Sequence, residues 1–107
     1  MWYTVLLSVL AGVMGANALP HFIKGLVGEE FPNVLGNSPL RNALAGWLGL
    51  ILTGLLIHAA ELPAHPWPDV LGIGAGAFVM AVFHGRGGAY RLNEALGLPN
   101  PPRKVAA

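Results

Sequence analysis

Four histidines are the side chains of this sequence best suited to proton transfer or ligand binding, because imidazole titrates near neutral pH and binds metals. They fall into two pairs. His21 and His84 lie where apolar runs give way to basic segments, whereas His58 and His65 lie in or beside a short stretch without Lys or Arg. The sequence contains no cysteine, which excludes disulfides, thiolate ligands and cysteine nucleophiles.

The first candidate site is a polar cluster of Asn17, His21, Asn42 and His84. Asn17 and His21 share one helix face because they are four residues apart. In one interpretation, the cluster is a binding or proton-relay site at the mouth of the protein. In the other, the asparagines form hydrogen bonds between helices and the histidines lie at the headgroup boundary. We prefer the second, because asparagine commonly links membrane helices.

The second candidate site is the sequence H-x-x-E-x-x-x-H, formed by His58, Glu61 and His65. These residue types suit zinc or another divalent metal. The spacing is not a recognised metal signature, and Pro63 and Pro66 prevent one continuous helix. We therefore expect no metal ion and no other cofactor. Since nothing resembles a pair of nucleophile and base either, the sequence does not favour an enzyme.

The amino-acid composition indicates that these side chains belong to a membrane protein. The 107 residues are enough for a single domain. They are 54% hydrophobic and only 10% charged, against about 25% charged in average soluble domains. One apolar run alone would fit a helix buried in a soluble core. Three such runs in so short a chain leave almost nothing to enclose them, so we expect a membrane protein.

The apolar runs predict membrane spans at about residues 1–23, 39–58 and 67–84. The first 22 residues carry no charged side chain, and as a helix they would extend about 33 Å, which suffices for a hydrocarbon core of about 30 Å. Ser38 is a suitable N-cap for the second span, and Pro39 and Pro68 suit first helical turns. The predicted fold is all-α, a three-helix transmembrane bundle.

The basic residues predict the orientation of the bundle. All six Lys and Arg residues follow the first or the third span, and none lies before the first span or between the second and third. Basic loops stay on the cytoplasmic side, so we expect the N-terminus outside and the C-terminus inside. Ala16-Asn17-Ala18 has the form of a signal-peptide cleavage site, but no basic segment precedes it. We therefore expect the first span to be retained.

The rest of the chain completes one transmembrane domain, residues 1–98. A short interfacial helix is expected at about 89–97, and residues 99–107 form a basic, proline-rich cytoplasmic tail. Each span carries small residues that let helix backbones approach closely. These are Ser8, Ala11, Gly12, Gly15 and Ala16 in the first span, Ala45, Gly46, Gly49 and Gly54 in the second, and Gly72, Gly74 and Gly76 in the third. They predict a tight bundle and further contacts between copies.

Part of the sequence resembles a known group. The pattern N-x-x-P-H-F-x-x-G-x-x-G-x-x-F-P begins at Asn17, and S-P-L-x-N-x-x-x-G-W follows from Ser38. Together they cover roughly residues 17–47 and are similar to patterns in small uncharacterised bacterial integral membrane proteins. The resemblance implies no activity, but it draws attention to the polar residues around Asn17 rather than to the His58–His65 segment.

Two functions follow as expectations. The first is a small integral membrane protein that acts through helix packing, as a homo-oligomer or as a subunit of a larger membrane complex. The alternative is a protomer of an oligomeric transporter or channel with a polar site at the cytoplasmic mouth. Under either function, the expected partners of the protein are the lipid bilayer and a second copy or another membrane protein, with no nucleic acid. We expect a multi-pass location in the cell membrane, in bacteria the inner membrane.

Overall fold

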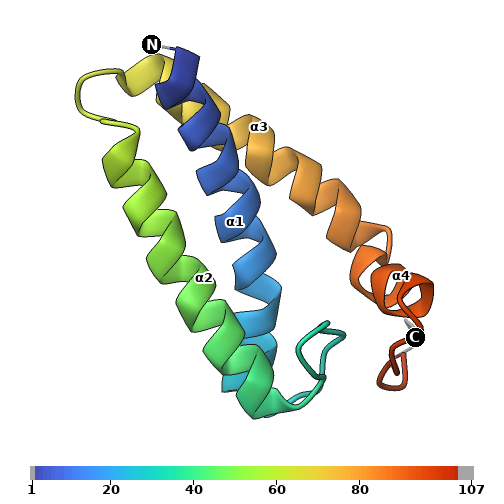
Figure 1. Cartoon of the computed structure of the whole chain (residues 1–107). Coiled ribbons are helices and arrows are strands. Elements are labelled where there is room, and N and C mark those ends of the chain that lie inside the picture. The colour runs from blue at the N-terminus through green and yellow to red at the C-terminus, as the bar shows by residue number, and fades with distance from the viewer. Residues whose placement is uncertain (1, 104–107) are drawn as a thin grey trace.

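The computed structural model describes residues 2–103, and this part of the chain is all-α, with four helices and no strand (Figure 1). The helices are α1 (Trp2–Leu26), α2 (Pro39–Ala59), α3 (Pro66–Gly85) and α4 (Gly88–Ala95). The first three are long and apolar enough to cross a membrane. The prediction of an all-α fold with three long apolar helices is therefore confirmed, and the composition of these helices indicates a multi-pass membrane protein.

The helix boundaries follow local sequence signals. The Ser38 hydroxyl accepts a hydrogen bond from the Arg41 backbone N–H at 3.2 Å, and Pro39 begins α2 behind it. Pro66 begins α3, but His65 before it forms no side-chain capping bond. The helix α1 runs through Pro20 without interruption and ends at Leu26, three residues beyond the predicted span. The helix α4 lies in the stretch where a short helix is expected.

The helix α1 lies between α2 and α3 and packs against both of them (Figure 1). Within residues 2–103, α2 and α3 do not pack against each other. The short α4 contacts the end of α3. One helix therefore supplies both interfaces of the bundle, so each of its two packed faces must fit a different neighbour.

Glycines bring the backbones of α1 and α3 into direct contact. A Cβ atom added at Gly76 would overlap the carbonyl oxygen of Val9, and one added at Gly12 would overlap that of Ile73. Close approach of this kind is how small residues hold membrane helices together, because lipid gives no hydrophobic driving force between them. The predicted small-residue face is confirmed at this interface.

The interface between α1 and α2 uses the same principle. A Cβ atom at Gly46 would lie 2.5 Å from the Phe22 backbone nitrogen, and one at Gly49 would lie 2.7 Å from the Cβ atom of Ala18. Gly54 and Gly74 differ, because no atom lies within 4 Å of the corresponding positions. These two glycines face away from the bundle and take no part in the packing within one chain.

Large apolar side chains cover the outside of the bundle. Trp47 on α2 and Phe78 on α3 are more than half exposed, and the buried positions of the three long helices are mostly small residues. A soluble protein would hide such side chains from water. In a bilayer they face lipid tails at no cost, so this inverted pattern agrees with the apolar composition of the spans.

Candidate functional site

The end of the bundle where α1 and α3 end and α2 begins carries every Lys and Arg within the described range, and we call it the basic end. These residues are Lys24, Arg41, Arg86, Arg91 and Arg103. Lys104 and the remainder of the predicted tail lie outside the described residues. All four residues of the predicted polar cluster lie near the basic end, and each belongs to one of the three long helices.

Asn42 is the centre of the cluster and is fully buried. Its Nδ2 group donates to three backbone carbonyls, those of Phe31 at 2.9 Å, Asn37 at 3.1 Å and Ser38 at 3.1 Å. These acceptors determine the orientation of the amide, so its Oδ1 atom must accept. His21 Nδ1 lies 2.6 Å from Oδ1 and is therefore the hydrogen-bond donor. This bond joins α1 to α2, and the Nδ2 bonds to Phe31 and Asn37 join α2 to the loop between the two helices.

The second bond of the cluster joins α1 to α3. His84 Nε2 donates to Asn17 Oδ1 at 2.9 Å. When the imidazole is neutral, the other ring nitrogen is then an acceptor. That atom, Nδ1, is buried and has no partner within residues 2–103. One histidine–asparagine bond therefore closes each interface of α1, and the second bond leaves one acceptor unused.

The two histidine rings lie close together at the base of the loop. Their centroids are 5.9 Å apart, and the Phe31 ring stacks edge-on against His21 at 5.2 Å. The structure thus brings together all four residues that the sequence analysis selected: Asn17, His21, Asn42 and His84. They meet as two cross-helix pairs rather than as a single ring of ligands.

Sequence reasoning missed a second set of polar residues beside this cluster. Asn93 on α4 is 1% exposed, and its Nδ2 group donates to Asn37 Oδ1 and to the Pro99 carbonyl, both at 3.2 Å. Asn33 is buried in the loop, where its Nδ2 group reaches Asn42 Oδ1 at 3.5 Å. The only sequence signal for these residues is that asparagine recurs in the segments outside the long helices.

A small cavity of about 110 Å³ lies against these side chains, between Asn17, His21, Asn33, His84 and Asn93. Asn93 uses its Nδ2 group elsewhere, so its Oδ1 atom is a second buried acceptor without a partner in the described chain. A cavity of this volume is large enough to hold water. The site can therefore hold water or another small hydrogen-bond donor between the two unused acceptors.

The second candidate site has a different outcome. Within residues 2–103 no group of three His, Asp or Glu side chains is placed to hold a metal ion, and this includes His58, Glu61 and His65. His58 lies near the end of α2, whereas Glu61 and His65 lie in the loop that follows. Glu61 adopts a left-handed backbone conformation, with φ at 57°. The structure therefore gives these three side chains no common ligand position.

Asp69 in the first turn of α3 is another buried polar residue. It is fully buried, and both carboxylate oxygens lack a hydrogen-bond partner within the described chain. Its place at the start of a helix is favourable for a carboxylate, because the N-terminus carries partial positive charge. It lies at the opposite end of the bundle from the histidine–asparagine cluster and does not contribute to it.

Comparison with family models, curated proteins and solved structures found no match to this chain. The functional assignment therefore rests on two features of the molecule itself. One is the histidine–asparagine cluster near the basic end. The other is the set of apolar faces that α2 and α3 turn away from α1.

Proposed function

We propose that this is a small integral membrane protein that acts through helix packing, as a homo-oligomer or as a subunit of a larger membrane complex. The observation that carries the proposal is the free faces of α2 and α3. Both are covered by exposed apolar side chains, and each contains a glycine, Gly54 or Gly74, with no neighbour within 4 Å. Small residues on such faces permit close approach of another helix.

The cluster supports this proposal because the amide of its central residue, Asn42, is fully engaged in hydrogen bonds within the chain. Both Asn42 amide atoms have partners within the chain, and these partners tie α2 to α1 and to the loop. An amide with every donor and acceptor engaged has nothing left to offer a ligand. Asn42 therefore fixes the position of α2 against α1 and the loop. A subunit of an assembly needs such a fixed arrangement of its helices.

We further propose that the protein lies in the cell membrane, in bacteria the inner membrane, with its N-terminus outside and its C-terminus inside. The support is the basic end, because the positive-inside rule assigns Lys and Arg to the cytoplasmic side. A fluorescent protein fused to the C-terminus should fluoresce, whereas periplasmic alkaline phosphatase at the same position should be inactive. An active phosphatase and a dark fluorescent fusion would reverse the orientation.

A second candidate function is a protomer of an oligomeric transporter or channel. The observation that favours it is the 110 Å³ cavity with its two unused acceptors, His84 Nδ1 and Asn93 Oδ1. Buried polar groups near the membrane are costly and are often retained for function. Three helices enclose no pore, so transport would require copies arranged around an axis next to the cluster.

Crosslinking between copies distinguishes the two functions, and the absence of native cysteine makes single-cysteine variants unambiguous. If packing drives assembly, Gly54→Cys and Gly74→Cys should crosslink in membranes. If a transport axis lies beside the cluster, Val34→Cys and Leu92→Cys should crosslink instead, because these exposed positions line the 110 Å³ cavity. Leu10→Cys, exposed on α1 and away from the cluster, serves as the control.

Native mass spectrometry can contradict the proposal that the protein assembles with other chains. Native mass spectrometry of the protein extracted from membranes should detect more than one copy, or one copy bound to a second chain. A monomer without any second chain, together with no crosslink at the four test positions, would remove both candidate functions.

A further inference from the structure

A cavity of about 460 Å³ lies at the basic end, where the end of α3 meets α4. Six residues line it, three from the end of α3 and three from α4. They are Val82, Phe83, Arg86, Gly88, Arg91 and Leu92. The volume is within the range of about 300–1,000 Å³ typical of small-molecule sites. None of the four residues of the histidine–asparagine cluster lines it.

Helical spacing brings the lining residues to one side of this turn. Arg86 comes one turn after Val82, and its backbone N–H donates to the Val82 carbonyl at 3.0 Å. On α4, Arg91 and Leu92 follow Gly88 by three and four residues, so the three share one helix face. Two short helix faces therefore place both arginines at a single cavity.

Both arginines are free to bind a ligand. They are exposed, and neither forms a side-chain hydrogen bond or an ion pair within residues 2–103. Glu94 follows Arg91 by three residues on α4, but it neither pairs with Arg91 nor lines the cavity. The lining therefore carries two cations and no carboxylate.

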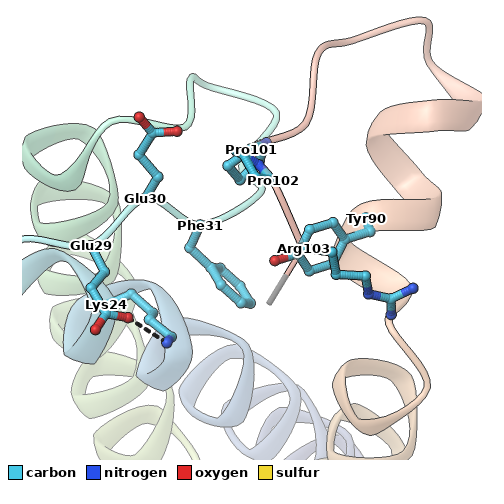
Figure 2. A pocket seen from close by; sticks show the side chains of 8 residues that line it. All are labelled: Lys24, Glu29, Glu30, Phe31, Tyr90, Pro101, Pro102 and Arg103. Carbon is cyan, nitrogen blue, oxygen red and sulfur yellow. Dashed lines mark hydrogen bonds and ion pairs between the residues drawn. The ribbon is translucent and has the colours of Figure 1, made fainter. Parts of the chain in front are cut away.

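A larger cavity at the basic end is built differently. It measures about 530 Å³ and lies between the end of α1, the loop that follows it, α4 and residues 101–103 (Figure 2). The Phe31 and Tyr90 rings lie with their centroids 6.2 Å apart, and Pro101 and Pro102 form a further wall. The segment that follows α4 thus closes one side of this cavity.

The charged side chains around the larger cavity do not converge on one ligand. Lys24 forms an ion pair with Glu29 at 2.6 Å, and Figure 2 shows the Glu30 carboxylate and the Arg103 guanidinium pointing away from the cavity. A Cβ atom added at Gly87 would overlap the Arg103 guanidinium. This third arginine therefore lies against the turn between α3 and α4, where it adds positive charge beside the smaller cavity.

We propose that the cavity between α3 and α4 binds the phosphate group of an anionic phospholipid. Arg86 and Arg91 are suited to it, because the planar guanidinium donates paired, charge-assisted hydrogen bonds to phosphate oxygens. Val82 and Leu92 are each 43% exposed, and with Phe83 they give an acyl chain an apolar wall in the same cavity. The inference rests on the proposed membrane location but not on the proposed assembly.

Position and charge determine which lipid fits. Arg86 directly follows a helix long and apolar enough to cross a membrane, so the cavity lies at the depth of the lipid headgroups. A headgroup with an ammonium would bring that cation toward two guanidinium groups, with no carboxylate in the lining to receive it. In the proposed orientation, the basic end faces the cytoplasm, where anionic lipids give the membrane surface its negative potential.

Lipid retention, measured by native mass spectrometry of the full chain, tests the proposal. The protein is released from nanodiscs that contain equal parts of phosphatidylglycerol and phosphatidylethanolamine. We expect phosphatidylglycerol to be retained about tenfold over phosphatidylethanolamine, somewhat less than two basic residues contribute at an anionic surface, because both lipids carry phosphate. Arg86→Gln and Arg91→Gln should each lower this ratio to about threefold, and the double variant should lower it to near unity.

Arg41→Gln is the matched control, because Arg41 is an exposed arginine at the same end of the molecule that does not line the cavity. The preference for phosphatidylglycerol should persist in this variant, and helical circular dichroism should show that every variant is folded. An equal loss in Arg41→Gln would overturn the proposal, because the preference would then follow net charge alone. A chain that enters the nanodiscs but retains both lipids equally would refute this proposal and leave the membrane location standing.

A soluble analogue separates a lipid site from a site for a free phosphate compound. Glycerophosphoglycerol carries the same headgroup without acyl chains, so it should displace the retained phosphatidylglycerol only at high concentration. If it binds to the protein in detergent while phosphatidylglycerol does not, the ligand is a soluble compound and the lipid proposal is wrong. Crosslinking of copies is measured separately, so failure of the assembly proposal does not decide this one.

Discussion

Replacement of Gly76 by leucine should separate α1 from α3 and destabilise the bundle by about 3 kcal/mol, near the upper end of the usual cost of overpacking. A Cβ atom at this position would already overlap the Val9 carbonyl, and the obstacle is backbone, which has no other rotamer to adopt. The free energy of unfolding, measured by titration with sodium dodecyl sulfate and helical circular dichroism, should show the loss.

Gly74→Leu is the matched control, because it lies on the same helix two residues away. No atom is within 4 Å of the position of its Cβ, so the same change should leave the stability of a single chain nearly unchanged. Equal destabilisation by the two substitutions would show that the loss comes from the glycines themselves and not from contact with α1. Gly74→Leu should instead weaken crosslinking between copies if the proposed assembly uses this face.

Removal of the Asn42 side chain should have the second large effect. Asn42→Ala leaves the His21 donor and the Phe31 carbonyl without their partner in a buried region, whereas the Asn37 and Ser38 carbonyls keep backbone donors. Since an unsatisfied buried group costs about 1–3 kcal/mol, we expect a loss of about 3 kcal/mol in the free energy of unfolding. The same detergent titration measures it, and hydrogen exchange should increase in the loop between α1 and α2.

Asn17→Ala provides the comparison, because Asn17 forms a single cross-helix bond, to His84. Hydrogen bonds between membrane helices average about 0.6 kcal/mol in one measured case, so this loss should be several times smaller. If Asn17→Ala cost as much as Asn42→Ala, the cluster would work as one cooperative network. If neither mattered, Asn42 would not hold the helices of the bundle together, and its bond to His21 would need a functional reason.

Much of the fold can be predicted from local sequence. The apolar runs predicted all three long helices, because a hydrophobic stretch of about 20 residues has few alternatives to a membrane helix. Ser38 and Pro39 predicted the start of α2, since capping depends on neighbouring residues alone. The predicted first span ends at about residue 23, whereas the helix α1 itself continues to Leu26.

The polar cluster could be predicted only as a set of residues. Helical spacing placed Asn17 and His21 on one face, and the apolar runs placed Asn42 and His84 at the same depth. Neither property selects the partner of each histidine. The pairing of His84 with Asn17 joins residues 67 positions apart in sequence, and it depends on the rotation of α3 about its own axis, which is set by packing.

The sequence by itself determined that this chain forms apolar helices, where they begin, and that its basic residues gather at one end. These properties depend on residue type and short-range order. Only the tertiary structure decided that Gly76 contacts α1 while Gly74 does not, and that Pro101 and Pro102 face Phe31 across a cavity. The physical reason is that small residues occur on several faces of α3, and only the angle and register of packing determine which face meets its neighbour.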